Sequence, residues 1–76
     1  MIPNINDKMY LKNDKTNKSI TTTVIDVWGE NKYHSAGFTV QYNLDKTNKI
    51  MYSEYKERDI GKFIFFNKKD INKTVK

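Results

Sequence analysis

The sequence contains no cysteine, one proline, three glycines and a single histidine among its 76 residues. Without cysteine, neither disulfides nor a thiolate metal site can support the fold, and the reducing cytoplasm is the expected compartment. No segment has the pattern of a signal peptide or of a membrane-spanning helix. We therefore expect residues 1–76 to form one cytoplasmic domain that needs no cofactor and depends on its apolar core.

Aromatic residues are the main resource for such a core. One tryptophan, five tyrosines and four phenylalanines are present, and each can bury roughly 150–250 Å². A chain this short buries only about 60% of the surface that it exposes when unfolded. Most large apolar side chains must therefore be buried in the core. Formation of a homodimer is another way for so small a chain to gain stability.

The spacing of apolar residues predicts a mainly β fold. Residues 19–28 are dense in β-branched side chains, and residues 38–44 alternate strictly between apolar and polar. Shorter strands are predicted at residues 9–12, 49–53 and 62–66. The last of these, KFIFF, is apolar on both faces and is expected to run through the centre of the core.

The strand pattern stops at Asn67, a residue that favours the N-cap of a helix. A short basic helix is predicted over residues 67–76, which hold four lysines and one aspartate. Five short strands joined mainly by tight turns and followed by such a helix indicate a small SH3-like five-stranded barrel or a bent antiparallel sheet. An OB-like barrel is the alternative.

The pentapeptide DKTNK occurs twice, at residues 14–18 and 45–49. Asp and Asn side chains bond to their own backbone and tolerate left-handed conformations, so both copies are predicted to be hairpin turns. In an up-and-down strand order the two turns lie at the same end of the sheet. That basic end suits the phosphates of nucleic acid or of an anionic small molecule such as a nucleotide. Its candidate residues are Lys15, Lys18, Lys46 and Lys49.

The opposite end is predicted to gather the loops at residues 29–36 and 54–61, with Gly29 and Gly37 permitting positive φ around the first loop. Tyrosine and tryptophan are enriched in interface hot spots, so aromatic residues at this end are candidates for contact with a protein partner. The candidates are Trp28, Tyr33, His34 and Tyr55.

No constellation of residues points to catalysis or to metal binding. His34 has no HxH, HxxE or cysteine partner in the sequence, whereas a metal site needs converging ligands. Any nucleophile and base pair would also depend on His34. The three glycines form no phosphate-binding motif. We therefore expect a protein that is not an enzyme and binds no metal.

The net charge is +5, and thirteen of the fourteen basic residues are lysine. Such a charge attracts anionic partners, but the same lysine-rich composition also follows from an AT-rich genome. Bidentate contacts to guanine favour arginine, and Arg58 is the one arginine. The leading prediction is a protein-interaction module. A small nucleic-acid-binding domain is the alternative, and a binder of an anionic small molecule is the third reading.

The segment RDIGKFIFF at residues 58–66, with a charged helix after it, resembles the ends of short uncharacterised proteins from phages and mobile elements of low-GC Gram-positive bacteria. The resemblance covers about the last twenty residues. This chain has Phe63 and Ile64 where threonine and valine are usual in those proteins. The resemblance implies a compact β domain of phage or plasmid origin, and it transfers no functional residue. On that origin, the predicted interaction module is an accessory protein that binds and inhibits a host factor, including a defence factor.

Overall fold

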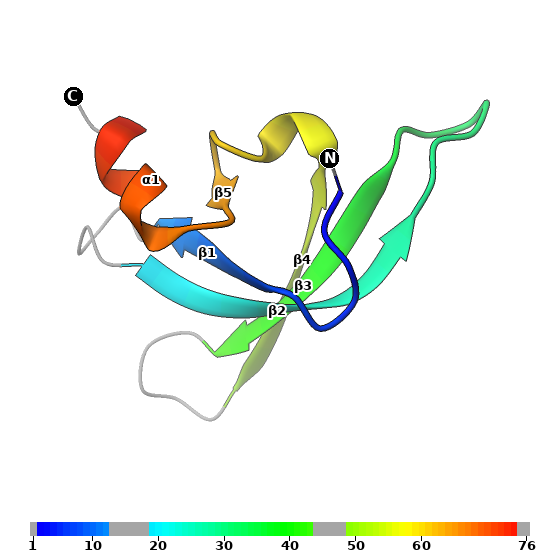
Figure 1. Cartoon of the computed structure of the whole chain (residues 1–76). Coiled ribbons are helices and arrows are strands. Elements are labelled where there is room, and N and C mark those ends of the chain that lie inside the picture. Colours follow the sequence, from blue (N-terminus) through cyan, green and yellow to red (C-terminus); the bar gives the residue numbers. More distant parts are fainter. Residues whose placement is uncertain (1, 13–18, 44–48, 75–76) are drawn as a thin grey trace.

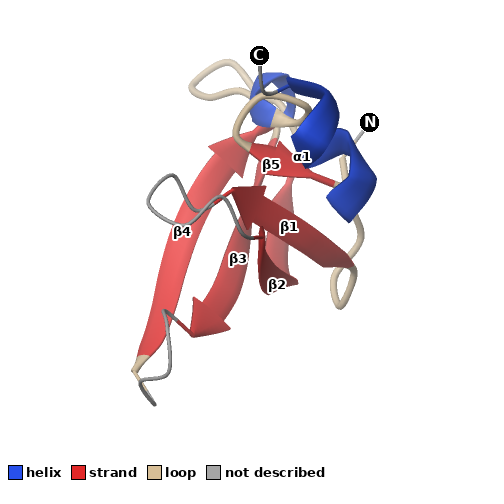
Figure 2. Ribbon diagram, turned by 90° about the vertical axis from the view of Figure 1, so that its left-hand side faces the viewer, coloured by secondary structure: helices blue, strands red, loops and turns tan. Residues whose placement is uncertain are grey.

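The computed structural model of the protein describes residues 2–12, 19–43 and 49–74 (Figure 1). Five strands form one antiparallel sheet in the order β4-β3-β2-β1-β5. The sheet curls into a half-barrel, and the helix lies near β5 (Figure 2). The elements are β1 (Lys8–Lys12), β2 (Ser19–Trp28), β3 (Gly37–Asn43), β4 (Ile50–Lys56), the 3₁₀ helix η1 (Glu57–Asp59), β5 (Ile64–Phe65) and α1 (Lys68–Thr74). The predicted mainly β, SH3-like architecture is confirmed.

One face of the sheet, here called the inner face, carries the apolar core. Alternation along each strand turns every second side chain to this face. Six buried residues from four strands form one cluster there, and they are Met9, Leu11, Val24, Phe38, Val40 and Ile64. The polar residue Thr22 is buried as well, and its hydroxyl donates a hydrogen bond to the carbonyl of Met9 at 3.1 Å. The core therefore lies inside the curl of the sheet.

A β-bulge in β2 changes which residues of this strand face the core. The register with β3 shifts between Val24 and Asp26, so that Ile25 is the extra residue. Val24 is fully buried, Val27 packs against the core, and Asp26 is exposed. Without the bulge, strict alternation would turn Asp26 and Trp28 inward with Val24. The bulge instead turns both of them to the opposite face, here called the outer face.

The strand predicted over residues 62–66 and through the centre of the core forms only in part, because Ile64 joins the core cluster but the strand is two residues long. Only Ile64 and Phe65 form β5, which lies at an edge of the sheet beside β1. The chain reaches it through a turn in which Gly61 adopts a φ of +90° and Asp59 accepts hydrogen bonds from two backbone N–H groups. That turn leaves Phe63 62% exposed. Runs of apolar residues predict burial but do not show where a turn ends.

Helix α1 begins directly after Asn67, as predicted, and lies against β5. Phe65 and Ile71 are buried outside the inner core cluster at this edge of the sheet. The ammonium of Lys68 sits 5.6 Å from the centre of the Tyr10 ring on β1. Among the described residues, no helix is long and apolar enough to cross a membrane.

Candidate functional site

Two rows of side chains cross β2, β3 and β4 on the outer face. The strand register places Asp26 opposite Thr39 and Thr39 opposite Glu54. The next row places Gly37 between Trp28 and Lys56. This end of the sheet also carries the loop at residues 29–36 and the segment after β4, so the predicted meeting of these two segments agrees with the strand register.

Trp28 rests on Gly37. A Cβ atom built on Gly37 would lie 2.6 Å from Cζ2 of Trp28 and 2.7 Å from the carbonyl oxygen of Tyr55. Only a residue without a side chain leaves room for the indole in this position. The prediction that Gly37 adopts a positive φ is wrong, and so is the same prediction for Gly29, because Gly61 is the one described glycine with that conformation. Gly37 is required for close packing.

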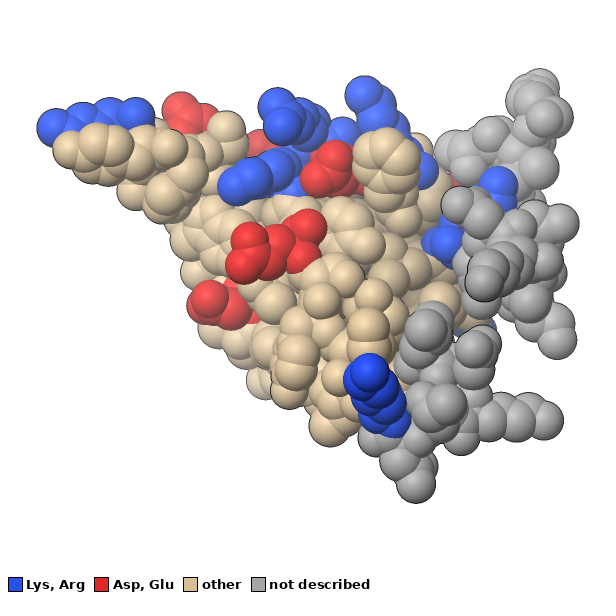
Figure 3. Space-filling view, turned by 180° about the vertical axis from the view of Figure 1, so that it is seen from behind, with Lys and Arg blue, Asp and Glu red and all other residues tan. Residues whose placement is uncertain are grey.

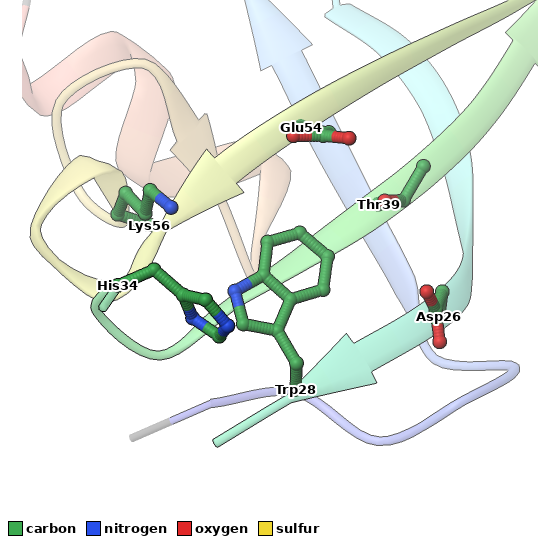
Figure 4. A pocket seen from close by; sticks show the side chains of 6 residues that line it. All are labelled: Asp26, Trp28, His34, Thr39, Glu54 and Lys56. Atoms are coloured by element: carbon green, nitrogen blue, oxygen red, sulfur yellow. The ribbon is translucent and has the colours of Figure 1, made fainter. Parts of the chain in front are cut away.

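The indole of Trp28 is held from several sides (Figure 4). Its Nε1 donates to the carbonyl of Ser35 at 3.1 Å. The ring of His34 meets it edge-on, with 6.5 Å between ring centres. The ammonium of Lys56 lies 5.5 Å from the ring centre. Trp28 is therefore partly buried and fixed in orientation while it remains part of the surface.

The loop that carries His34 is organised by Asn31. The side-chain oxygen of Asn31 accepts hydrogen bonds from the backbone N–H groups of Tyr33 at 2.7 Å and His34 at 3.0 Å. The side-chain nitrogen of Asn31 lies 2.9 Å from Nε2 of His34. Because that nitrogen can only donate, Nε2 accepts and the neutral ring carries its proton on Nδ1, 3.4 Å from the Ser35 carbonyl. Asn31 thereby positions His34 against Trp28.

These residues surround an open depression of about 410 Å³ on the outer face. We call it the Trp28 depression, and it is lined by Asp26, Trp28, His34, Thr39, Glu54 and Lys56. Figure 4 shows His34 and Lys56 on one side of the indole and Asp26 and Thr39 on the other. The depression thus combines one large aromatic face with two carboxylates and one ammonium group.

The structure brings Trp28 and His34 together but separates the other two aromatic candidates from them. Tyr33 follows Lys32 in the loop, is 81% exposed, and has the Lys32 ammonium 5.2 Å from its ring centre. Tyr55 lies on β4, which extends to Lys56 through the segment predicted to be a loop. Its ring packs on the inner face, 6.1 Å from the ring centre of Phe38. Tyr55 is therefore part of the core packing.

Four lining residues of the depression were not among the sequence-based candidates. They are Asp26, Thr39, Glu54 and Lys56. Their proximity depends on the register of three strands and on the bulge in β2, neither of which composition reveals. The one signal was Asp26 itself, because a carboxylate within a β-branched strand indicates an exposed position.

Burial raises the pKa of Tyr55 above its ordinary value of 10.0, and the nearby Tyr42 and Asp59 raise it further, while a hydrogen bond with Ser53 lowers it. The folded chain therefore retains the Tyr55 proton at a pH where the unfolded chain has lost it. Stability that depends on this proton is complete below about pH 10 and falls as the pH rises toward the folded-state pKa.

We expect Tyr55→Phe to reduce the loss of stability at alkaline pH. Phenylalanine cannot ionise in the unfolded chain, so the free energy of unfolding should fall less between about pH 9 and about pH 11 than in the wild type. Urea unfolding followed by circular dichroism at the two pH values measures the difference. Tyr33→Phe removes an exposed hydroxyl and is the matched control. An equal alkaline loss in wild type and Tyr55→Phe would contradict the prediction.

The lysine candidates are only partly within the described part of the chain. Lys15, Lys18 and Lys46 lie outside the described residues, and Lys49 is exposed just before β4. Figure 3 shows basic and acidic side chains beside one another on the face seen from behind. The described surface in that view is of mixed charge, and the proposed anion site at the lysine-rich turns stays a prediction.

Within the described residues, no group of three or more His, Cys, Asp or Glu side chains could hold a metal ion. Comparisons of the chain with protein-family models, with curated proteins and with solved structures give no match in any of the three.

Proposed function

We propose that this chain is a non-enzymatic protein-interaction module that binds its partner through the Trp28 depression and through Tyr33, which is exposed in the loop at residues 29–36. The observation that carries the proposal is the position of Trp28 on the outer face. A small domain gains most by burying a tryptophan in its core. A bulge that turns the one tryptophan outward, onto a glycine that leaves room for it, favours recognition over core packing.

The charges around the ring favour a protein over nucleic acid. Asp26 and Glu54 lie beside Trp28, and carboxylates repel the phosphates of a nucleic acid. Sites for single-stranded nucleic acid instead combine aromatic rings with lysine and arginine along one groove. Tyr33 adds an exposed aromatic side chain of the type that forms interface hot spots.

The resemblance of the C-terminal residues to phage and mobile-element proteins supports a host protein as the partner. On this proposal the domain inhibits or redirects a host factor, including a defence factor, by covering part of its surface. No chemistry by the chain itself is required.

The test is a pull-down from host lysate with the tagged chain, with and without nuclease and at two salt concentrations. We expect a discrete protein partner that survives both treatments, since an aromatic interface depends little on salt. Tyr33→Ala should weaken that interaction by about tenfold or more. Ile50→Ala removes a side chain that is 48% exposed at the far end of β4, and this control should bind like the wild type.

Recovery of nucleic acid alone, lost at high salt and unaffected by Tyr33→Ala, would contradict the proposal. It would move the site to the lysine-rich turns, because binding through several phosphate contacts weakens steeply as salt rises.

A further inference from the structure

Two carboxylates of the Trp28 depression are left without a partner. Within residues 2–12, 19–43 and 49–74, the side chains of Asp26 and Glu54 form neither a hydrogen bond nor an ion pair. The chain has fourteen basic residues against nine acidic ones, so pairing partners are abundant. Two unpaired carboxylates beside a tryptophan are therefore not explained by the internal contacts of the described fold.

The strand register sets the spacing between the Cα atoms of Asp26 and Glu54. Asp26 and Glu54 flank Thr39 in one row across β2, β3 and β4. Adjacent strands lie about 4.8 Å apart, so the two Cα atoms are about 10 Å apart. The short side chain of Thr39 lies between them and leaves the depression open. A cation seated above Thr39 could approach both carboxylates at once.

The indole beside this row already attracts a cation. The ammonium of Lys56 lies 5.5 Å from the centre of the Trp28 ring, within the range of a cation–π interaction. Lys56 reaches the ring from the next row, and Figure 4 shows it on the side away from Asp26. The ring is thus suited to a positively charged, flat group that enters from the side of the carboxylates.

We infer that the Trp28 depression binds an arginine side chain of the partner protein, with the guanidinium between Asp26 and Glu54 and against Trp28. This inference rests on the proposed function and names the chemistry that its site selects. A guanidinium is planar, carries five N–H donors and stacks on aromatic rings, so it can contact two carboxylates and an indole together. The ammonium of a lysine lacks the flat face.

The net charge of +5 does not prevent this binding. Charges farther away than about 8 Å are largely screened at physiological ionic strength. Inside the depression the two carboxylates outnumber the single ammonium of Lys56. The local field therefore favours a cation even though the whole chain is basic.

Trp28 is the only tryptophan, so its fluorescence reports directly on the depression. The probe is a capped tetrapeptide with two arginines, titrated into the full chain at physiological salt. Matched peptides carry lysine, or the uncharged isostere citrulline, in place of arginine. We expect a saturable change in fluorescence with arginine, a weaker affinity with lysine and no saturable change with citrulline.

Substitutions of the lining residues test the same assignment. Asp26→Asn and Glu54→Gln should each weaken arginine binding by about two- to fivefold, whereas Glu30→Gln, an exposed acidic residue of the loop, should leave it unchanged. Lys56→Gln should tighten binding, because it removes the cation that competes for the ring. Denaturation curves establish that each variant is folded.

Equal affinity for the arginine and citrulline peptides would overturn the inference, and so would loss of binding in Lys56→Gln, since both results exclude recognition of a cation. A saturable response to an oligothymidylate or to an acidic peptide instead of the arginine peptide would also overturn it. If the pull-down partner depends on Tyr33 but tolerates Asp26→Asn with Glu54→Gln, the proposed function stands and the arginine site is wrong.

Discussion

Phe38→Ala is expected to destabilise the fold by about 3–5 kcal/mol, because it removes a fully buried ring and leaves a cavity. Phe38 lies in the inner core cluster on β3, and its ring packs 6.1 Å from that of Tyr55. Small domains have a total stability of about 5–15 kcal/mol, and a chain of this size lies toward the lower end. The variant should therefore be partly or largely unfolded at room temperature.

Phe63→Ala is the matched control for this prediction. It makes the same chemical change at a side chain that is 62% exposed, so its effect should stay within about 0.5 kcal/mol. Urea unfolding followed by far-ultraviolet circular dichroism and by Trp28 fluorescence gives both values. Equal loss in the two variants would show that Phe38 is not a main support of the core.

The comparison of these two phenylalanines also shows where sequence analysis succeeds. Phe38 begins a strictly alternating segment, and alternation fixes the face of each residue once one of them is buried. Phe63 belongs to a run that is apolar at every position, which carries no information about face or about the turn that ends at this residue. The structure resolves the ambiguity with a two-residue edge strand, β5.

The candidate site was harder to predict than the fold for a related reason. The sequence of β2 predicts a strand with the observed bounds, but one extra residue at Ile25 reverses the facing of Asp26 and Trp28. Tyr55 was predicted to lie in a loop and to contact a partner. Strand β4 instead extends to Lys56 and places the Tyr55 ring on the inner face. Local propensity predicts that a strand forms, whereas bulges and registers depend on contacts between strands.

Gly37→Ala is expected to cost about 1–3 kcal/mol, the usual penalty for overfilling a packed position. The new methyl group would lie 2.6 Å from Cζ2 of Trp28 and 2.7 Å from the backbone carbonyl oxygen of Tyr55. The indole could swing away, but the carbonyl belongs to the neighbouring strand and cannot move without disturbing the sheet. Both the stability of the fold and the position of Trp28 should therefore change.

Gly29→Ala is the matched control, because nothing lies within 4 Å of a Cβ atom at that position and its φ is not positive. It should be neutral or stabilise the chain by up to about 1 kcal/mol through the unfolded state. Urea unfolding compares the stability of the two variants. The emission maximum of Trp28 reports whether the indole has moved away from its position against residue 37. If Gly37→Ala matched Gly29→Ala in stability and emission, Trp28 would not rest on β3. The two rows of side chains would then not form the depression, and both binding proposals would lose their structural basis.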